Sequence, residues 1–113
     1  MRYEEPAFRS REATLATIRA GTLDEVRDAI IGASLNASDP TWVEAMCLDV
    51  ARTRDDCGIQ GAAVLGLAHL ARRFRHLDDC TAAEAVLLQL RDVPDLAGRA
   101  NDGRDDFATF LAP

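Results

Sequence analysis

The stretch of residues 55–74 constrains the fold of this chain more than any other. It begins with two aspartates, is apolar or small over residues 59–71 except for Gln60 and His69, and ends among arginines. Acidic residues at the start and basic residues at the end are the arrangement that a helix dipole favours. A helix that is apolar on most sides is buried on most sides. The stretch therefore predicts a central helix that is packed from both flanks.

Composition places this helix in a small all-α protein. A chain of 113 residues fits one domain, and we take residues 1–113 as that domain. Alanine and leucine dominate and aromatic residues make up only 5%, which favours helix over sheet. The net charge is -6, and every basic residue other than histidine is an arginine. An acidic chain is poorly suited to nucleic acid and better suited to a basic protein partner, although mild acidity also serves solubility alone.

The sequence predicts no metal, no cofactor and no membrane segment. Its three cysteines form no Cys-x-x-Cys pair, and its two histidines complete no zinc pattern with them. Cys47 lies in an apolar helical run and is predicted to be a small core residue, whereas Cys57 and Cys80 lie near predicted helix starts. The N-terminus lacks a signal-peptide-like apolar core, and no apolar run approaches the roughly 20 residues of a membrane span. We therefore expect a cytoplasmic protein.

Apolar spacing and turn signals predict about six helices in three antiparallel hairpins. The helices are expected at residues 10–20, 23–34, 40–52, 57–74, 82–91 and 95–111, and the hairpins at about 10–34, 40–75 and 81–112. The local signals are capping boxes at Thr22–Glu25 and Thr81–Glu84, a cap at Asp39 before Pro40, and a left-handed stop at Gly21. In the last helix, Gly98 is expected to permit close helix approach and Gly103 to mark a bend.

A degenerate repeat underlies these helices. Residues 44–50 resemble residues 84–90, and residues 26–30, 59–63 and 96–100 share an aliphatic residue followed by a small or aliphatic one four positions on. The segment 56–63, Asp-Cys-Gly-Ile-Gln-Gly-Ala-Ala, resembles the Asp-x-x-Val-Arg-x-x-Ala start of the second helix of a HEAT repeat. This resemblance implies a HEAT-like α-solenoid, in which hairpins stack because none can bury its apolar face alone. A compact six-helix bundle is the alternative.

Charged side chains offer candidate contacts, and most have a structural alternative. His69 could be a core or groove residue held by a neighbour, a partner contact, or a catalytic base. The aspartates of the turns could be helix caps that lie at one level of the stack. Asp102 lies three and four positions from two further aspartates, a repulsive spacing that suggests docking of a partner's arginines or, less simply, a metal. The arginines after residue 71 could complement the helix end and pair with acids such as Asp78.

No motif for catalysis accompanies these residues, so we expect a binding protein rather than an enzyme. The candidate partner-binding residues are Asp55, Asp56, His69, Arg73, Asp78, Asp79, Asp102, Asp105 and Asp106.

Two segments carry a more specific resemblance. Residues 98–110, Gly-Arg-Ala-Asn-Asp-Gly-Arg-Asp-Asp-Phe-Ala-Thr-Phe, and residues 66–72, Gly-Leu-Ala-His-Leu-Ala-Arg, resemble immunity proteins of bacterial polymorphic toxins, including those of contact-dependent growth inhibition. The resemblance implies a cytoplasmic inhibitor that binds a cognate toxin domain, often a nuclease, and blocks its active site. The alternatives are a HEAT-like scaffold or adaptor and, third, an enzyme like the HEAT-like DNA glycosylases, which would need a longer basic groove.

Overall fold

The structure, a computed structural model, describes residues 6–111. Six α-helices and no strand occur within that range, which confirms the all-α prediction. The helices are α1 (Arg11–Ala20), α2 (Leu23–Asn36), α3 (Pro40–Thr53), α4 (Cys57–Phe74), α5 (Cys80–Leu90) and α6 (Ala97–Phe110). Residues 1–5, to which the signal-peptide prediction applies, and residue 112, the predicted end of the third hairpin, lie outside the described residues.

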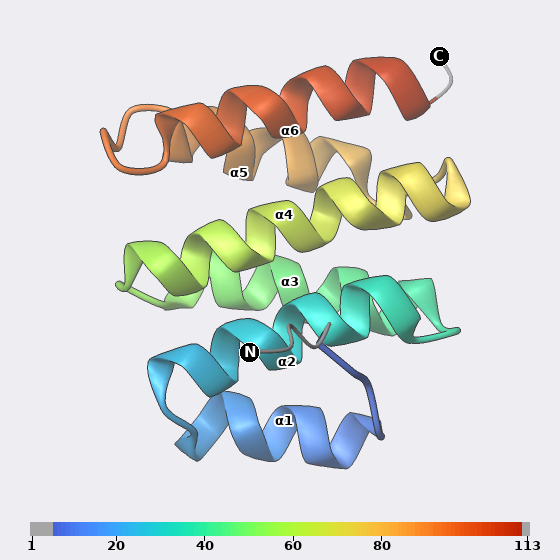
Figure 1. Cartoon of the computed structure of the whole chain (residues 1–113). Coiled ribbons are helices and arrows are strands. Elements are labelled where there is room, and N and C mark those ends of the chain that lie inside the picture. The colour runs from blue at the N-terminus through green and yellow to red at the C-terminus, as the bar shows by residue number, and fades with distance from the viewer. Residues whose placement is uncertain (1–5, 112–113) are drawn as a thin grey trace, which may run out of the picture.

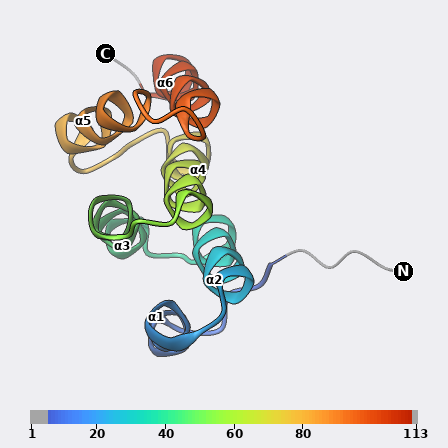
Figure 2. The same cartoon turned by 90° about the vertical axis from the view of Figure 1, so that its left-hand side faces the viewer.

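The helices form two layers. Consecutive helices pair as α1–α2, α3–α4 and α5–α6, and these hairpins lie one above the next (Figure 1). Figure 2 shows α2, α4 and α6 in one layer and α1, α3 and α5 in the other. Neighbouring helices pack much more closely in the layer of α2, α4 and α6 than in the layer of α1, α3 and α5. The layer of α2, α4 and α6 therefore lies on the inner side of the stack's curve, and we call it the inner layer and the other the outer layer. The assignment of the stack to HEAT repeats stays a prediction.

Helix α4 lies at the centre, as its composition predicts. It packs against α2 on one flank, α6 on the other and α3 beneath. Leu67 and Leu70 are fully buried, and Ile59 is 2% exposed. Burying a large aliphatic side chain stabilises the fold by roughly 1.5–3 kcal/mol, so α4 contributes more to the core than its neighbours do.

Two of the predicted caps are confirmed. At the start of α2, the Thr22 hydroxyl accepts the Glu25 N–H at 3.2 Å, and a Glu25 carboxylate oxygen accepts the Thr22 N–H at 2.8 Å. At the start of α3, the Asp39 carboxylate accepts the Trp42 N–H at 3.3 Å, with proline at the first helical position. These side chains satisfy N–H groups that a helix cannot pair internally.

The capping box predicted for α5 is wrong. The helix begins at Cys80, and the Asp79 carboxylate caps it by accepting the Ala82 N–H at 2.9 Å. The predicted cap residue, Thr81, is already inside the helix, and Glu84 is exposed. A buried carboxylate explains the earlier start, since Glu44 of α3 accepts the Asp78 and Asp79 N–H groups at 2.7 and 2.8 Å.

The predicted roles of three glycines also need correction. Gly21 ends α1 with a φ of -77°, not in the left-handed region. In α6 the close approach occurs at Gly103, where a β-carbon would lie 3.3 Å from the Leu87 side chain and 3.5 Å from that of Val64. No neighbouring atom lies within 4 Å of such a carbon at Gly98. Gly103 therefore lets α6 approach both α4 and α5.

Candidate protein-interaction surface

The solvent side of the inner layer carries most of the candidate chemistry. Helix α4 contributes a stripe with alternating spacings of four and three: Gly58, Ala62, Leu65, His69 and Arg72. Residues at this spacing lie on one side of a helix. The flanking helices add Arg27 and Ile31 from α2, Arg99, Asp102 and Asp106 from α6, and Asp95 from the turn before α6. We call these residues together the α4 face.

An ion pair crosses this face between α4 and α6. Arg72 donates to the Asp106 carboxylate at 2.6 Å, and the Asp106 side chain is only 19% exposed. Asp102 is exposed and lines the same hollow, whereas Asp105 is exposed but does not line it. Asp106 thus already holds an arginine of its own chain, while the carboxylates of Asp102 and Asp105 remain accessible to a partner.

His69 lies half-buried in the middle of the face. Burial lowers its pKa first, and the neighbouring positive charge of Arg72 lowers it further, with smaller contributions from Arg73 and Arg99. Asp106 acts in the opposite direction and raises the pKa. The neutral imidazole is therefore favoured.

Arg73 joins two helices. Its guanidinium donates to the Ser34 carbonyl at 2.7 Å and to the Ala37 carbonyl at 3.0 Å, which satisfies the C-terminal end of α2. The expectation that these arginines pair with acids is confirmed for Arg72, which pairs with Asp106, but is wrong for Arg73, which donates to carbonyls, and for Asp78 as the partner. Asp78 accepts from His76 at 2.9 Å instead.

The turn aspartates do not lie at one level of the stack. Asp55 and Asp56 precede α4, and Asp78 and Asp79 follow it, so the two pairs lie at opposite ends of an 18-residue helix. Such a helix is about 27 Å long. Asp56 caps α4 by accepting the Ile59 N–H at 2.9 Å, while Asp55 is exposed. Hydrogen bonds from the Thr41 and His76 side chains lower the pKa of Asp78, which keeps it ionised.

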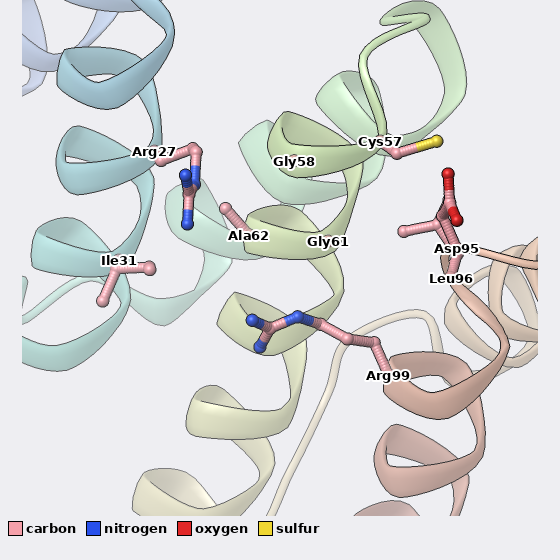
Figure 3. Close-up of a pocket in the computed structure, with 9 residues that line it drawn as sticks. All are labelled: Arg27, Ile31, Cys57, Gly58, Gly61, Ala62, Asp95, Leu96 and Arg99. Atoms are coloured by element: carbon pink, nitrogen blue, oxygen red, sulfur yellow. The ribbon is translucent and has the colours of Figure 1, made fainter.

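Sequence reasoning missed a pocket lined by two arginines. The pocket lies between α2, α4 and α6, and its volume is about 280 Å³. Figure 3 shows Arg27 reaching into it from α2 and Arg99 from α6, with both guanidinium groups on the side of the pocket where Ala62 lies. The carboxylate of Asp95 lies near Cys57 on the other side, away from both (Figure 3).

The sequence repeat contains the information that directs both arginines of this pocket toward α4. Val26 and Leu96 are equivalent buried positions in the shared pattern. Arg27 follows Val26 by one residue, which places it about 100° further around the helix. Arg99 follows Leu96 by three residues, which places it about 60° around the helix in the opposite direction. Each therefore faces α4 from its own flank, although the pattern by itself favours no ligand.

The described residues offer little support for a metal site, a reactive cysteine or a membrane-spanning helix. Within residues 6–111 no group of three or more His, Cys, Asp or Glu side chains could hold a metal ion. Cys47 is fully buried, as predicted, and burial raises the pKa of its thiol to about 12. Cys57 and Cys80 are the first residues of α4 and α5, also as predicted. None of the described helices is long and apolar enough to cross a bilayer.

Two layers of helices with one mixed-charge inner face define an all-α stacked-helix protein. The chain is similar to one in the crystal structure of a CDI complex from Cupriavidus taiwanensis LMG 19424. The two are 31% identical, the match covers 99% of each chain, and the TM-score is 0.82. The chain therefore belongs to the same family as that component of a CDI complex. No family model matches the sequence, and no curated protein does.

Proposed function

We propose that this protein is the immunity protein of a contact-dependent growth inhibition (CDI) system, and that it binds and neutralises a cognate toxin domain. The full-length similarity to a chain of a CDI complex carries this proposal. The chemistry of the α4 face supports it, since charged groups of both signs surround two hollows. Such a surface suits recognition of another protein better than it suits a small molecule.

We further propose that the toxin is a basic domain with nuclease activity and that inhibition occurs in the cytoplasm. The net charge of -6 supports a basic partner, because complementary charge speeds encounter. The predicted acidic contacts in the turns and on α6 fit this arrangement. Asp56 and Asp79 also cap helices, so the freest acidic contacts are those of Asp55, Asp102 and Asp105.

The proposal predicts that the gene immediately upstream encodes the toxin, and the direct test uses the C-terminal domain of that toxin. We expect the two proteins to co-purify, and co-expression of this chain to restore growth of cells that produce the toxin. A chain that neither binds nor protects would contradict the proposal and leave a scaffold role.

The acidic contacts are tested by changing Asp102, Asp105 and Asp106 together to asparagine. Association with the toxin should slow and lose much of its dependence on salt, because steering by opposite charge acts on the association rate. The matched control changes three exposed acids of the outer layer, Glu12→Gln, Asp49→Asn and Glu84→Gln, and removes the same charge elsewhere. Stopped-flow association at low and high salt compares the two. Equal rates for both variants would exclude the α6 acids as the contact.

A further inference from the structure

The pocket between α2, α4 and α6 holds two arginines with little to neutralise them. Among residues 6–111, Arg99 has no carboxylate within salt-bridge distance. Arg27 has only Asp24 of its own helix at 3.6 Å, and that side chain is 91% exposed. The one acid that lines the pocket, Asp95, points away from both guanidinium groups (Figure 3). Two positive charges therefore face a cavity whose own acid, Asp95, pairs with neither of them.

The floor of the pocket accommodates these side chains. A β-carbon at Gly61 would lie 3.3 Å from Arg99 Nε, so the arginine stem lies directly over a glycine of α4. At Gly58 the nearest atom to such a carbon is Asp56 Oδ1 at 3.0 Å, and the stem of Arg27 follows with its Cδ at 3.5 Å. Absence of a side chain at Gly61 lets Arg99 lie low on α4, whereas Arg27 lies at ordinary contact distance from Gly58. Both side chains reach into the pocket (Figure 3).

We propose that this pocket is the anchor point for a single carboxylate side chain of the toxin, an aspartate or glutamate held between Arg27 and Arg99. Guanidinium groups bind carboxylates through paired hydrogen bonds, and a protein–protein anchor of this kind is strongest when it is shielded from water. The inference rests on the proposed immunity function and names the partner group that the α4 face recognises.

A single carboxylate fits the surroundings better than a phosphate backbone. Asp95, Asp102 and Asp106 surround the two arginines on the same face, and the chain carries a net charge of -6. A polyanion that lies across this face would be repelled by these acids along its length. One inserted carboxylate side chain contacts only the arginines. A basic toxin that presents one acid here would gain specificity, because the site rejects partners that leave the arginines unpaired.

The test compares two pairs of substitutions that remove the same charge. Arg27→Gln with Arg99→Gln should weaken toxin binding by about 30-fold or more, since loss of one side of a shielded charge pair has effects of that size. Arg19→Gln with Arg52→Gln, at exposed positions of the outer layer, makes the chain equally more acidic. Binding of that control to a basic toxin should stay equal or become tighter, so the two variants move in opposite directions.

Three further measurements make the outcome decisive. Circular dichroism and chemical denaturation establish that each variant folds. Arg27→Lys with Arg99→Lys keeps the charge but not the paired hydrogen-bond geometry, so its toxin binding should weaken to an intermediate degree. Substitution of surface acids of the toxin should reveal one whose effect disappears in the Arg27→Gln, Arg99→Gln background. Oligonucleotide binding that depends on the two arginines would overturn the proposal in favour of phosphate.

The possible failures are distinguishable. If the unaltered protein binds the toxin and the Arg27→Gln, Arg99→Gln variant binds as tightly, the carboxylate anchor is wrong and the immunity function stands. If the unaltered protein does not bind the toxin, both proposals are wrong.

Discussion

At the scale of single residues, the pKa of His69 depends on the charged side chains of the α4 face. Burial and then the charge of Arg72 lower its pKa, and Asp106 raises it. A histidine whose folded pKa lies below its unfolded value of about 6.5 takes up protons more readily when the chain is unfolded. Its effect on stability is therefore neutral above about pH 6.5, and stability falls as the pH drops through that value and then through the folded pKa.

We predict that Asp106→Asn lowers the pKa of His69 further and that Arg72→Gln raises it. A titration of the His69 ring followed by NMR measures both shifts. His69→Asn serves as the stability control, because it should remove the corresponding loss of unfolding free energy between pH 8 and pH 5.5. Shifts in the reverse directions would mean that these charges do not govern the imidazole.

Gly66 makes the tightest contact with buried side chains. A β-carbon there would lie 2.5 Å from Ser34 Oγ and 2.8 Å from Cys47 Sγ, and the Ser34 hydroxyl is already held by the Ile30 carbonyl at 2.8 Å. We predict that Gly66→Ala lowers the free energy of unfolding by about 1–3 kcal/mol, the usual effect of overpacking. Gly98→Ala, at an open helical position, should raise it by about 0.5–1 kcal/mol. Urea titrations measure both, and a more stable Gly66→Ala variant would contradict the packing.

At the scale of helices, two adjacent aspartates differ in role, because one caps a helix and the other is only exposed to solvent. Asp56 accepts the Ile59 N–H at the start of α4, whereas Asp55 is exposed and caps nothing. Asp56→Ala should therefore reduce the free energy of unfolding by about 1 kcal/mol, while Asp55→Ala should change it by less than about 0.5 kcal/mol. Thermal denaturation of the two variants compares them. If Asp55→Ala nevertheless weakens toxin binding, that residue acts through the interface alone.

Helix type and approximate bounds were predictable because their causes are local. The Thr22–Glu25 box and the Asp39 cap involve residues within three positions of each other, and both are present. The start of α5 was not predictable, since the contact that fixes it joins the Asp78 and Asp79 N–H groups to Glu44, more than thirty residues away. A local signal at Thr81 was overridden by a tertiary hydrogen bond.

At the scale of the whole molecule, the candidate site was predicted only in part. His69, Asp102 and Asp106 do lie around one face, because regular spacing on helices carries information about direction. The turn aspartates were wrongly expected at one level, although the order of turns and helices along the chain already places Asp55 and Asp56 at one end of α4 and the pair after α4 at the other. The convergence of Arg27 and Arg99 depends on the distance between α2 and α6, which only the packing of α4 between them determines.

The same packing predicts how the molecule unfolds. Leu67 is fully buried in α4, which contacts both neighbouring hairpins, so a cavity there should weaken the whole stack and not one end of it. Leu67→Ala should reduce the free energy of unfolding by about 2–5 kcal/mol, whereas Leu88→Ala, at a leucine that is 42% exposed, should cost much less. The single tryptophan, Trp42, lies in α3 and reports on the middle hairpin, while circular dichroism reports on all helices. Both signals should shift together to lower denaturant. A loss below about 1 kcal/mol, or separate transitions for the two probes, would show that α4 does not couple the hairpins.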